Sequence, residues 1–317
     1  MFKPKLKFPQ EFPLLKKKIT ARIGLDLGSS SLKIVVLEPK ENNYVLKQAR
    51  VTELSSKSVD INSLIKDLDV SPGVNLGICG PSIAVRYVIV TKMNDDEFKR
   101  SLRYEAASHL PFRLEELYLD GAILKQLPEN KMLVMFAAAK KEFVDLKLRL
   151  FQESNIKLNL LDIDSLALIN AFNYVQAGND IFSGGAIVLL NIGASITSIN
   201  ILEDGIPHFS RDIDIGGKDI SKGTSRDVVV ANLVSEIRKS LDYYEAGSAA
   251  IINKIFLSGG ASLISNLAND LGNFLGIPIQ HWDPLSNFEF ESGLDEASIR
   301  KSSVLFGVAV GLALREK

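Results

Sequence analysis

Four glycine turns carry the residues of this sequence that are best suited to hold a charged ligand. The first turn, in "IGLDLGSSSLKIVVLE", contains an acid, a glycine, three serines and a lysine: Asp26, Gly28, Ser29, Ser30, Ser31 and Lys33. Glycine lets a ligand approach the backbone, and N–H groups, hydroxyls and a lysine are donors for a phosphate chain. Asp26 is the predicted metal ligand, holding magnesium through water, because hard cations prefer oxygen ligands.

The second turn repeats the first. "VLLNIGASITSINIL" aligns with "IGLDLGSSSLKIVVL" at an offset of 165 residues, which places Asn191 over Asp26 and Ser195 over Ser30. Apolar positions coincide on both sides of the turn, so we predict a duplicated hairpin, one in each of two similar lobes. Ligands commonly bind between domains, and we therefore expect the two turns to face each other across a cleft.

Two further turns complete the predicted site. "DIDIGGKDI" adds Gly216 and Gly217, and "KIFLSGGASLISNL" runs from a strand into a helix through Gly259, Gly260 and Ala261. Backbone N–H groups at a helix start attract anions, and the latter glycines could lie against a base or ribose. The second turn contributes five predicted nucleotide-binding residues: Asn191, Gly193, Ala194, Ser195 and Thr197. Each turn alone is typical of an ordinary hairpin, but their joint order favours a nucleotide site.

The composition is that of an ordinary globular protein, and the length is enough for two cores. The 317 residues are 46% hydrophobic, and the net charge of -1 gives no indication of nucleic-acid binding. A single cysteine, Cys79, excludes an internal disulfide and fits a reducing compartment. The three histidines lie far apart without metal-ligand spacing, and no segment has the ~18 apolar residues needed to cross a bilayer.

A basic leader precedes the first predicted strand. Its first 18 residues contain six lysines and one glutamate, interrupted by three prolines. Residues 1–20 are interpreted as a flexible tail, because the prolines prevent a continuous amphipathic helix. Weak attraction to an anionic membrane surface is the alternative.

The hydrophobic pattern divides the rest of the chain into lobes. The expected units are a first lobe at 21–89, an inserted α+β subdomain at 90–160, a connecting helix at 161–180, a second lobe at 181–300 and a C-terminal helix at 301–317 that returns to the first lobe. In the insert, "NDDEFKRSLRYEAASHLPF" predicts a helix capped by Asn94 or Asp95 and ended by Pro111.

Two pairs of charged residues have alternative interpretations. Asp162 and Asp164 precede the connecting helix, and either is a candidate for positioning water or simply for capping that helix. Glu236 and Lys239 lie on a helix with one apolar face, where they could contact a ribose or form an exposed i,i+3 pair. No residue has a clear catalytic role.

These motifs resemble the actin-like ATPase superfamily, which includes actin, heat-shock chaperones, sugar kinases and the division protein FtsA. "GLDLGSSSLK" and "LLNIGASITSINIL" are similar to its two phosphate motifs, "IFLSGGASLI" to its adenosine motif, and "DSLALINAF" and "FGVAVGLAL" to its connecting helices. Within it, "LRYEAASHLPFRLEELYLD", "LLDIDSLALINAF" and "EIRKSLDYY" resemble the PilM family of type IV pilus assembly proteins, over nearly the whole chain and in its order.

The resemblance implies a duplicated actin-like α/β fold whose two lobes enclose a nucleotide, with ATP and Mg2+ as ligands. It also implies a cytoplasmic protein at the inner face of the inner membrane, held there through partners. The implied partners are the N-terminal cytoplasmic peptide of a PilN-type membrane protein, bound in a groove near the insert, and other type IV pilus assembly proteins. Self-association stays open.

The sequence departs from the family at two places. Asn191 stands where the family usually has an aspartate, so one of two magnesium-facing charges is missing and hydrolysis is expected to be impaired. The stretch from Gly217 to Glu236 is short, and "KGTSRD" predicts a bare loop where the family places much of a fourth subdomain, here reduced around 218–230. A trimmed lineage and an engineered deletion are both compatible with this.

Three functions follow from these observations. The favoured hypothesis is a nucleotide-responsive adaptor with at most weak ATPase activity. The alternatives are a pseudo-ATPase scaffold that binds partners but not nucleotide, which Asn191 and the short loop favour, and a small-molecule kinase of the same superfamily. A kinase would need a clustered polar set for its substrate, and the sequence shows none.

Overall fold

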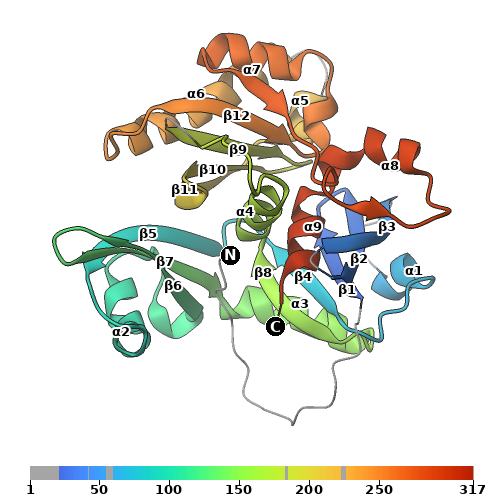
Figure 1. Cartoon of the computed structure of the whole chain (residues 1–317), viewed down its shortest axis with the longest axis horizontal. Coiled ribbons are helices and arrows are strands. Elements are labelled where there is room, and N and C mark those ends of the chain that lie inside the picture. The colour runs from blue at the N-terminus through green and yellow to red at the C-terminus, as the bar shows by residue number, and fades with distance from the viewer. Residues whose placement is uncertain (1–20, 42, 55–59, 183–184, 223–225, 317) are drawn as a thin grey trace.

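A computed structural model describes residues 21–41, 43–54, 60–182, 185–222 and 226–316. The basic leader therefore lies outside the described residues. Three sheets and the helices around them form two lobes and an insert (Figure 1). Within the described residues, no helix is long and apolar enough to cross a bilayer.

The first lobe is built on a six-stranded sheet of order β14-β3-β2-β1-β4-β8. Its strands are β1 (Arg22–Leu27), β2 (Ser31–Lys40), β3 (Asn43–Glu53), β4 (Val74–Ile78), β8 (Leu158–Ile163) and β14 (Glu289–Phe290). The second lobe has a five-stranded sheet of order β11-β10-β9-β12-β13. Its strands are β9 (Ala186–Ile192), β10 (Thr197–Glu203), β11 (Ile206–Ile213), β12 (Ile252–Ser258) and β13 (Ile279–His281).

The predicted duplication is confirmed by the strand register. Asp26 pairs with Lys33 across the β1–β2 hairpin, and Asn191 pairs with Ser198 across the β9–β10 hairpin, which is the same pairing shifted by the same 165 residues. The parallel neighbours also correspond, because β4 lies beside β1 as β12 lies beside β9. The two-lobed α/β fold expected from the sequence is therefore observed.

Helices cover both faces of the two large sheets. They are α1 (Ile61–Ile65), α3 (Lys141–Glu153), α4 (Asp164–Val175), α5 (Gly217–Ile220), α6 (Arg226–Glu245), α7 (Leu267–Leu275), α8 (Glu296–Lys301) and α9 (Gly307–Leu314), with short 3-10 turns η3 (Gly260–Leu263) and η4 (Ser303–Leu305). The apolar run of β2 serves two cores, since Val35 and Leu37 pack on one face of the sheet and Ile34 and Val36 on the other. This arrangement explains why the run does not alternate with polar residues.

The connecting helices α4 and α9 pack together between the two lobes (Figure 1). Glycine makes this possible at two places. A Cβ atom on Gly311 would lie 1.7 Å from the carbonyl oxygen of Ala167 in α4, and one on Gly24 in β1 would lie 2.0 Å from that of Ala309 in α9. The two helices and the first strand therefore touch backbone to backbone.

The insert contains a three-stranded sheet of order β5-β7-β6 with α2 on one face. Its elements are β5 (Ile83–Thr91), α2 (Asp95–Ala107), the 3-10 turn η1 (Leu114–Glu116), β6 (Leu117–Leu127) and β7 (Lys131–Lys140). Asn94 caps α2 in a capping box with Glu97, which decides between the two predicted caps.

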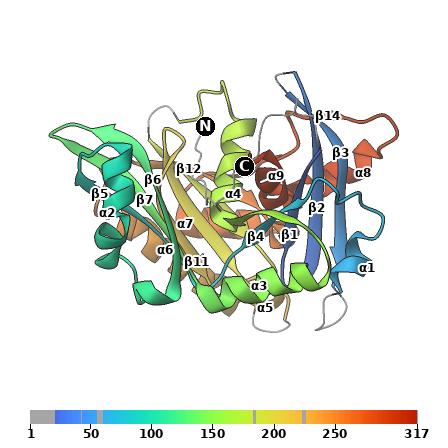
Figure 2. The same cartoon turned by 90° about the horizontal axis from the view of Figure 1, so that it is seen from below.

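The insert differs from the expected range 90–160 at both ends. Its sheet already begins at Ile83, because β5 pairs along its length with β7. At the other end, β8 joins β4 in the first-lobe sheet, and Phe151 of α3 packs in the core of that lobe. Figure 2 shows α3 extending from the insert towards the first lobe.

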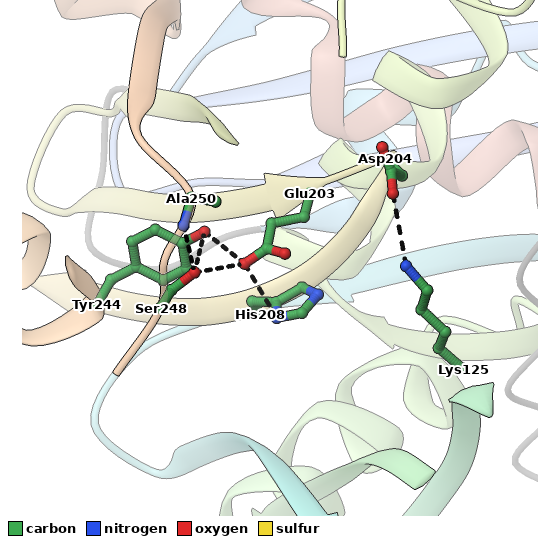
Figure 3. Close-up of polar contacts among 7 residues, drawn as sticks. All are labelled: Lys125, Glu203, Asp204, His208, Tyr244, Ser248 and Ala250. Carbon is green, nitrogen blue, oxygen red and sulfur yellow. Dashed lines mark hydrogen bonds and ion pairs between the residues drawn. The ribbon is translucent and has the colours of Figure 1, made fainter. Parts of the chain in front are cut away.

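The other face of the insert sheet packs against α4 and the second lobe. Val85 and Met135 belong to the same core as residues of α4 and α9. The Tyr87 hydroxyl lies 2.9 Å from that of Ser210 in β11, and Lys125 forms an ion pair of 3.4 Å with Asp204 (Figure 3). The insert therefore contacts both lobes rather than projecting from one.

Beside this contact, Glu203 connects the end of α6 to the second-lobe sheet (Figure 3). Its carboxylate accepts hydrogen bonds from the Tyr244 hydroxyl at 2.6 Å and the Ser248 hydroxyl at 2.9 Å, and His208 Nδ1 lies 3.5 Å away. Burial is the main cause of the lowered pKa of His208, and burial together with the Tyr244–Glu203 hydrogen bond raises the pKa of Tyr244.

The short stretch around 218–230 is helical at both ends, and residues 223–225 between them lie outside the described residues. Lys218 lies in α5, and α6 begins at Arg226. The prediction of a bare loop is therefore wrong for Arg226 and Asp227, which form the first turn of α6. Arg226 also forms an ion pair of 2.8 Å with Asp270 of α7, which fixes this helix start.

Candidate nucleotide site between the two lobes

The first and second glycine turns touch each other. Both are closed by the same backbone hydrogen bond, from Gly28 N to Ser31 O at 3.1 Å and from Gly193 N to Ile196 O at 2.9 Å. The hydroxyls of Ser29 and Ser195 lie 2.8 Å apart, so the turns meet from opposite lobes. The structure thus brings residues of the two predicted turns together.

The contacting serine in the first lobe is Ser29 rather than Ser30, the residue that aligns with Ser195. The carbonyl of Ser30 accepts a hydrogen bond of 2.8 Å from Leu54 N, which ties Ser30 to the segment after β3. The alignment identifies equivalent backbone positions within each lobe. It does not identify which residues meet when the two lobes face each other.

The third turn packs directly against the backbone of the second turn. A Cβ atom on Gly216 would lie 2.5 Å from Ser195 N, and Gly217 N donates to the carbonyl of Gly193 at 2.9 Å. Lys218, which follows the two glycines, reaches across to the first lobe and donates to the carbonyl of Ser29 at 3.1 Å. Sequence reasoning missed Lys218, although a lysine directly after a glycine pair was the available signal.

Asp26 and Lys33 form an ion pair of 3.3 Å at the base of the first turn. Their side chains are only 11% and 16% exposed, so the pair is largely shielded from water. A Cβ atom placed on Gly28 would lie 3.1 Å from Lys33 Nζ, which is a tight contact. The predicted cation and the predicted metal ligand are therefore adjacent, and they neutralise each other in this arrangement.

Asp164, at the start of α4, is the second buried carboxyl of the site. Burial and the nearby charges of Asp26 and Asp212 raise the pKa of Asp164 to about 8, against a hydrogen bond with Cys79 that lowers it. Its Oδ1 atom is buried and has no hydrogen-bond partner within the described structure. Neither of the two predicted candidates, Asp162 and Asp164, caps α4 with its side chain.

Asp162 has a different environment. Its carboxylate pairs with Arg315 Nε at 2.5 Å and accepts from Ile163 N at 2.8 Å. Of the two predicted candidates, Asp164 is therefore the one that lies near Asp26 and is affected by its charge. Asp162 is paired with Arg315, in the segment after α9.

Asp212 of β11 was missed by sequence reasoning. It accepts a hydrogen bond from Ser198 in its own lobe at 2.6 Å and from the backbone N–H of Gly80 in the first lobe at 3.0 Å. It therefore links the two lobes beside the acidic residues of the site. The available signal was its place in "DIDIGG", where Asp212 comes two residues before Asp214 and four before Gly216.

The remaining predicted residues form the second-lobe side of the site. Asn191 Oδ1 lies 3.3 Å from the Ser258 hydroxyl, beside Gly259. Gly259 has φ +87°, and a Cβ there would lie 2.4 Å from the carbonyl of Ile192, so only glycine fits this turn. Ala261 is buried and would touch any side chain at Gly217.

Two further predicted residues make contacts within the second lobe. Thr197 is fully buried and donates to the carbonyl of Ile215 at 2.7 Å, so its hydroxyl holds the third turn in place. Glu236 pairs with Lys239 at 2.5 Å and with Arg211 at 2.6 Å, which matches the alternative of an i,i+3 pair.

The donors and acids present fit a magnesium-bound phosphate chain. Backbone N–H groups, serine hydroxyls and Lys218 converge where the turns meet, and Asp26 and Asp164 lie beside them. The part of the chain that the structure describes contains no group of three or more His, Cys, Asp and Glu side chains suited to hold a metal directly. Magnesium would therefore depend on water and phosphate for most of its ligands.

A family model of the type IV pilus assembly protein PilM matches residues 24–229 and 227–317. The chain belongs to the PilM family. A solved PilM–PilN type IV pilus biogenesis complex has a chain that is 23% identical, with 94% of this chain and 99% of that chain covered and a TM-score of 0.82.

More distant structures share the fold. An actin-like ATPase fold protein of unknown function from Bacteroides thetaiotaomicron is 12% identical over 90% of this chain and 96% of its own, with a TM-score of 0.52. The cytoplasmic domain of EpsL, from the type II secretion system of Vibrio cholerae, is 10% identical over 94% and 96%, with a TM-score of 0.51. These likenesses show the actin-like architecture alone.

Proposed function

We propose that this PilM-family protein is an adaptor that binds magnesium-ATP between its glycine turns and an N-terminal peptide of a PilN-type membrane protein beside its insert. The peptide would hold it at the cytoplasmic face of the inner membrane. The observation that carries the nucleotide part is the contact between Ser29 and Ser195, because it joins two equivalent phosphate-type turns from opposite lobes.

Each lobe would contribute its own donors to the nucleotide. Gly28 and the serines of the first turn face Gly193, Ala194 and Ser195, while Gly216 and Gly217 support the second turn. When bound, magnesium would neutralise phosphate charge, with Asp26 as the carboxylate able to hold its water ligands. Because the turns are in contact, the lobes must separate to admit the phosphate chain.

A groove beside the insert has the character expected of a peptide site. It has a volume of about 150 Å³ and is lined mainly by apolar residues of β6, β7, β8 and α3, including Ala137, Val144, Leu148 and Leu160. We call it the insert groove. Peptides commonly bind such sites in extended form, adding main-chain hydrogen bonds at an exposed strand edge.

Strand β8 offers such an edge. It is the outermost strand of the first-lobe sheet, and all six of its residues, Leu158–Ile163, line the insert groove. Because alternate side chains point to opposite faces of a strand, consecutive lining residues mean that the groove runs along the strand edge. A PilN-type segment could therefore pair with β8 while its side chains enter the apolar part of the groove.

The insert provides a physical connection between the two sites. Its sheet forms one wall of the insert groove, and its edge contacts β11 through Tyr87 and Ser210. The same strand β11 carries Asp212, which bonds to the first lobe beside the nucleotide turns. A change in lobe separation would thus alter the groove, which amounts to a shift between two domain arrangements.

Isothermal titration tests both parts with the folded chain. Magnesium-ATP and the organism's own PilN N-terminal peptide are titrated separately, and each is expected to bind. The Lys33→Ala variant should weaken ATP binding and leave peptide binding unchanged. Absence of heat with both ligands in folded protein would contradict the proposal.

A pseudo-ATPase scaffold is the second candidate. Asn191 stands where the family usually has an aspartate, so the second turn has no carboxylate at the position equivalent to Asp26. Thermal unfolding with and without magnesium-ATP separates the two candidates. If the wild type and Lys33→Ala are equally unaffected by ATP while the peptide still binds, the scaffold interpretation is correct.

A further inference from the structure

The insert groove contains a half-buried carboxylate that forms no ion pair within the described residues. Asp120 of β6 lines the groove among apolar residues such as Met135, Ala137 and Leu166. Its side chain accepts one hydrogen bond, of 2.9 Å, from the backbone N–H of Gly121. Among the described residues, no lysine, arginine or histidine forms an ion pair with it.

The other carboxylate of the groove is already neutralised. Asp162 of β8 pairs with Arg315 at 2.5 Å, and both side chains are at most 11% exposed. Burial, together with the negative charge of Asp162, raises the pKa of Asp120. A carboxylate in such surroundings gains free energy when a ligand brings a cation, because desolvation of its charge is otherwise uncompensated.

We propose that Asp120 is a specificity-determining residue of the insert groove, which selects an extended partner segment whose apolar side chains are accompanied by one lysine or arginine. This inference rests on the proposed function, in which a PilN-type peptide occupies the groove. The apolar lining would accept the hydrophobic side chains of the segment, and the β8 edge would accept its backbone. Asp120 would then fix the register, since only one position along the segment brings the cation to it.

Asp120 acts here through charge rather than through packing. Asparagine keeps the size of the side chain and the oxygen that accepts from Gly121 N, so Asp120→Asn removes the charge with little change in shape. Glu129→Gln is the matched control, because Glu129 is a 77% exposed carboxylate on the β6–β7 turn of the same sheet, paired with Lys131 outside the groove.

A double-mutant cycle by isothermal titration tests the inference. The probes are the N-terminal cytoplasmic peptide of the organism's own PilN and copies in which each lysine or arginine is replaced in turn by norleucine. Asp120→Asn is expected to lower the affinity for the native peptide roughly tenfold. For one norleucine copy, the one that lacks the cation facing Asp120, the variant and the wild type should have the same affinity. Glu129→Gln should bind every peptide as the wild type does.

The pH dependence gives a second readout that a merely structural role would not produce. Binding of the native peptide to the wild type should tighten as the pH rises and Asp120 loses its proton, and Asp120→Asn should not show this change. Thermal unfolding confirms that both variants fold.

The outcomes separate this inference from the proposed function. If the wild type binds none of the peptides, the proposed function fails and the role of Asp120 falls with it. If the native peptide binds the wild type and Asp120→Asn equally, or contains no basic residue and still binds, the peptide site stands and the role of Asp120 is overturned.

Discussion

At the scale of single residues, three acids lie near one another where the two lobes meet, and each has different surroundings. Asp26 is balanced by Lys33, and Asp212 accepts two hydrogen bonds. Within the described part of the chain no cation forms an ion pair with Asp164, and burial beside these two acids raises its pKa to about 8. Near neutral pH, Asp164 is therefore largely protonated, which lets three carboxyl groups share one buried region.

Asp164→Asn should change how stability depends on pH. In the unfolded chain an aspartate releases its proton near pH ~3.9, whereas folded Asp164 keeps it until about pH 8. The free energy of unfolding of the wild type should therefore fall as pH rises from ~4 to ~8. Removing the carboxyl group should flatten this slope and raise the stability at pH 9 by about 2 kcal/mol or more.

Urea unfolding between pH 5 and 9 measures this effect. The exposed Asp242→Asn variant serves as the control and should keep the wild-type slope. An Asp164→Asn protein whose stability falls with pH as steeply as that of the wild type would show that the carboxyl is ionised in the folded state.

Asn191→Asp should increase magnesium-dependent ATP hydrolysis. The new carboxylate would occupy the position of the second hairpin that is equivalent to Asp26 in the first, and would add the charge that a magnesium-bound water can use. A several-fold increase in phosphate release is expected, since metal-assisted charge stabilisation contributes several kcal/mol where it operates. An unchanged rate would mean that the missing charge does not limit the reaction.

At the scale of elements, helix α9 makes close backbone contacts with helix α4 on one side and with strand β1 on the other. These contacts exist because Gly311 and Gly24 have no side chain. Helix α9 has no polar side chain and is buried over its whole length, Gly307–Leu314. The position of each lobe relative to the other therefore depends on the crossing of two helices at one glycine.

Gly311→Ala should strongly destabilise the protein. The added methyl group would lie 1.7 Å from the carbonyl oxygen of Ala167, so α4 and α9 must move apart, at a cost of about 3 kcal/mol. Gly272→Ala in α7 is the matched control. Its methyl group would meet nothing closer than 3.8 Å, and alanine should stabilise the helix by about 0.5 kcal/mol. Urea unfolding distinguishes them, and equal stability of the two variants would refute the close crossing.

Elements and the positions of turns were largely predictable from the sequence. The two hairpins share a register because the same apolar pattern flanks both turns, and the start of α2 was predicted with its cap at Asn94 or Asp95, of which the structure has Asn94. The insert boundary was not, because β5 is apolar enough to belong to either sheet. Its assignment depends on its pairing with β7, a contact between distant segments.

The candidate site was predictable within each lobe and less so between lobes. Its glycines and serines lie where the motifs indicate, because local backbone geometry fixes them. The contact of Ser29 with Ser195, the role of Asp212 and the distinction between Asp162 and Asp164 depend on how one lobe lies against the other. Sequence periodicity carries no information about that placement.

At the scale of the whole molecule, few polar contacts hold the lobes together on the side of the glycine turns. Ser29 meets Ser195, Lys218 reaches the carbonyl of Ser29, and Asp212 accepts from Gly80 N. Such exposed or half-buried hydrogen bonds contribute about 1 kcal/mol each, whereas the helix crossing is apolar and buried. Separation of the turns around the helices is therefore the motion that the structure favours.

A cysteine pair can test whether this separation is required. In Ser29→Cys/Ser195→Cys, the two sulfur atoms replace hydroxyls that lie 2.8 Å apart, a position from which a disulfide can form. The oxidised protein should not bind magnesium-ATP, and reduction should restore binding. Cys79 is the one native cysteine and lies partly buried, so the engineered pair can be followed by thiol titration.

Two results would contradict this expectation. Nucleotide binding that is undiminished in the oxidised protein would show that the turns need not part. Failure of the pair to oxidise would show that the turns do not meet in solution. Each single cysteine variant serves as a control for the loss of the serine hydroxyl.

The packing of α9 against β1 also has a consequence for biosynthesis. On the ribosome, strand β1 emerges first, yet the helix that shields its sheet comes from residues 307–314. Until these residues leave the exit tunnel, Leu37 and Val35 face water on one side. The second lobe, whose sheet and outer helices come from residues 186–281, can fold earlier. The nascent first lobe is thus the part that chaperones would need to protect, and it is completed last although it is begun first.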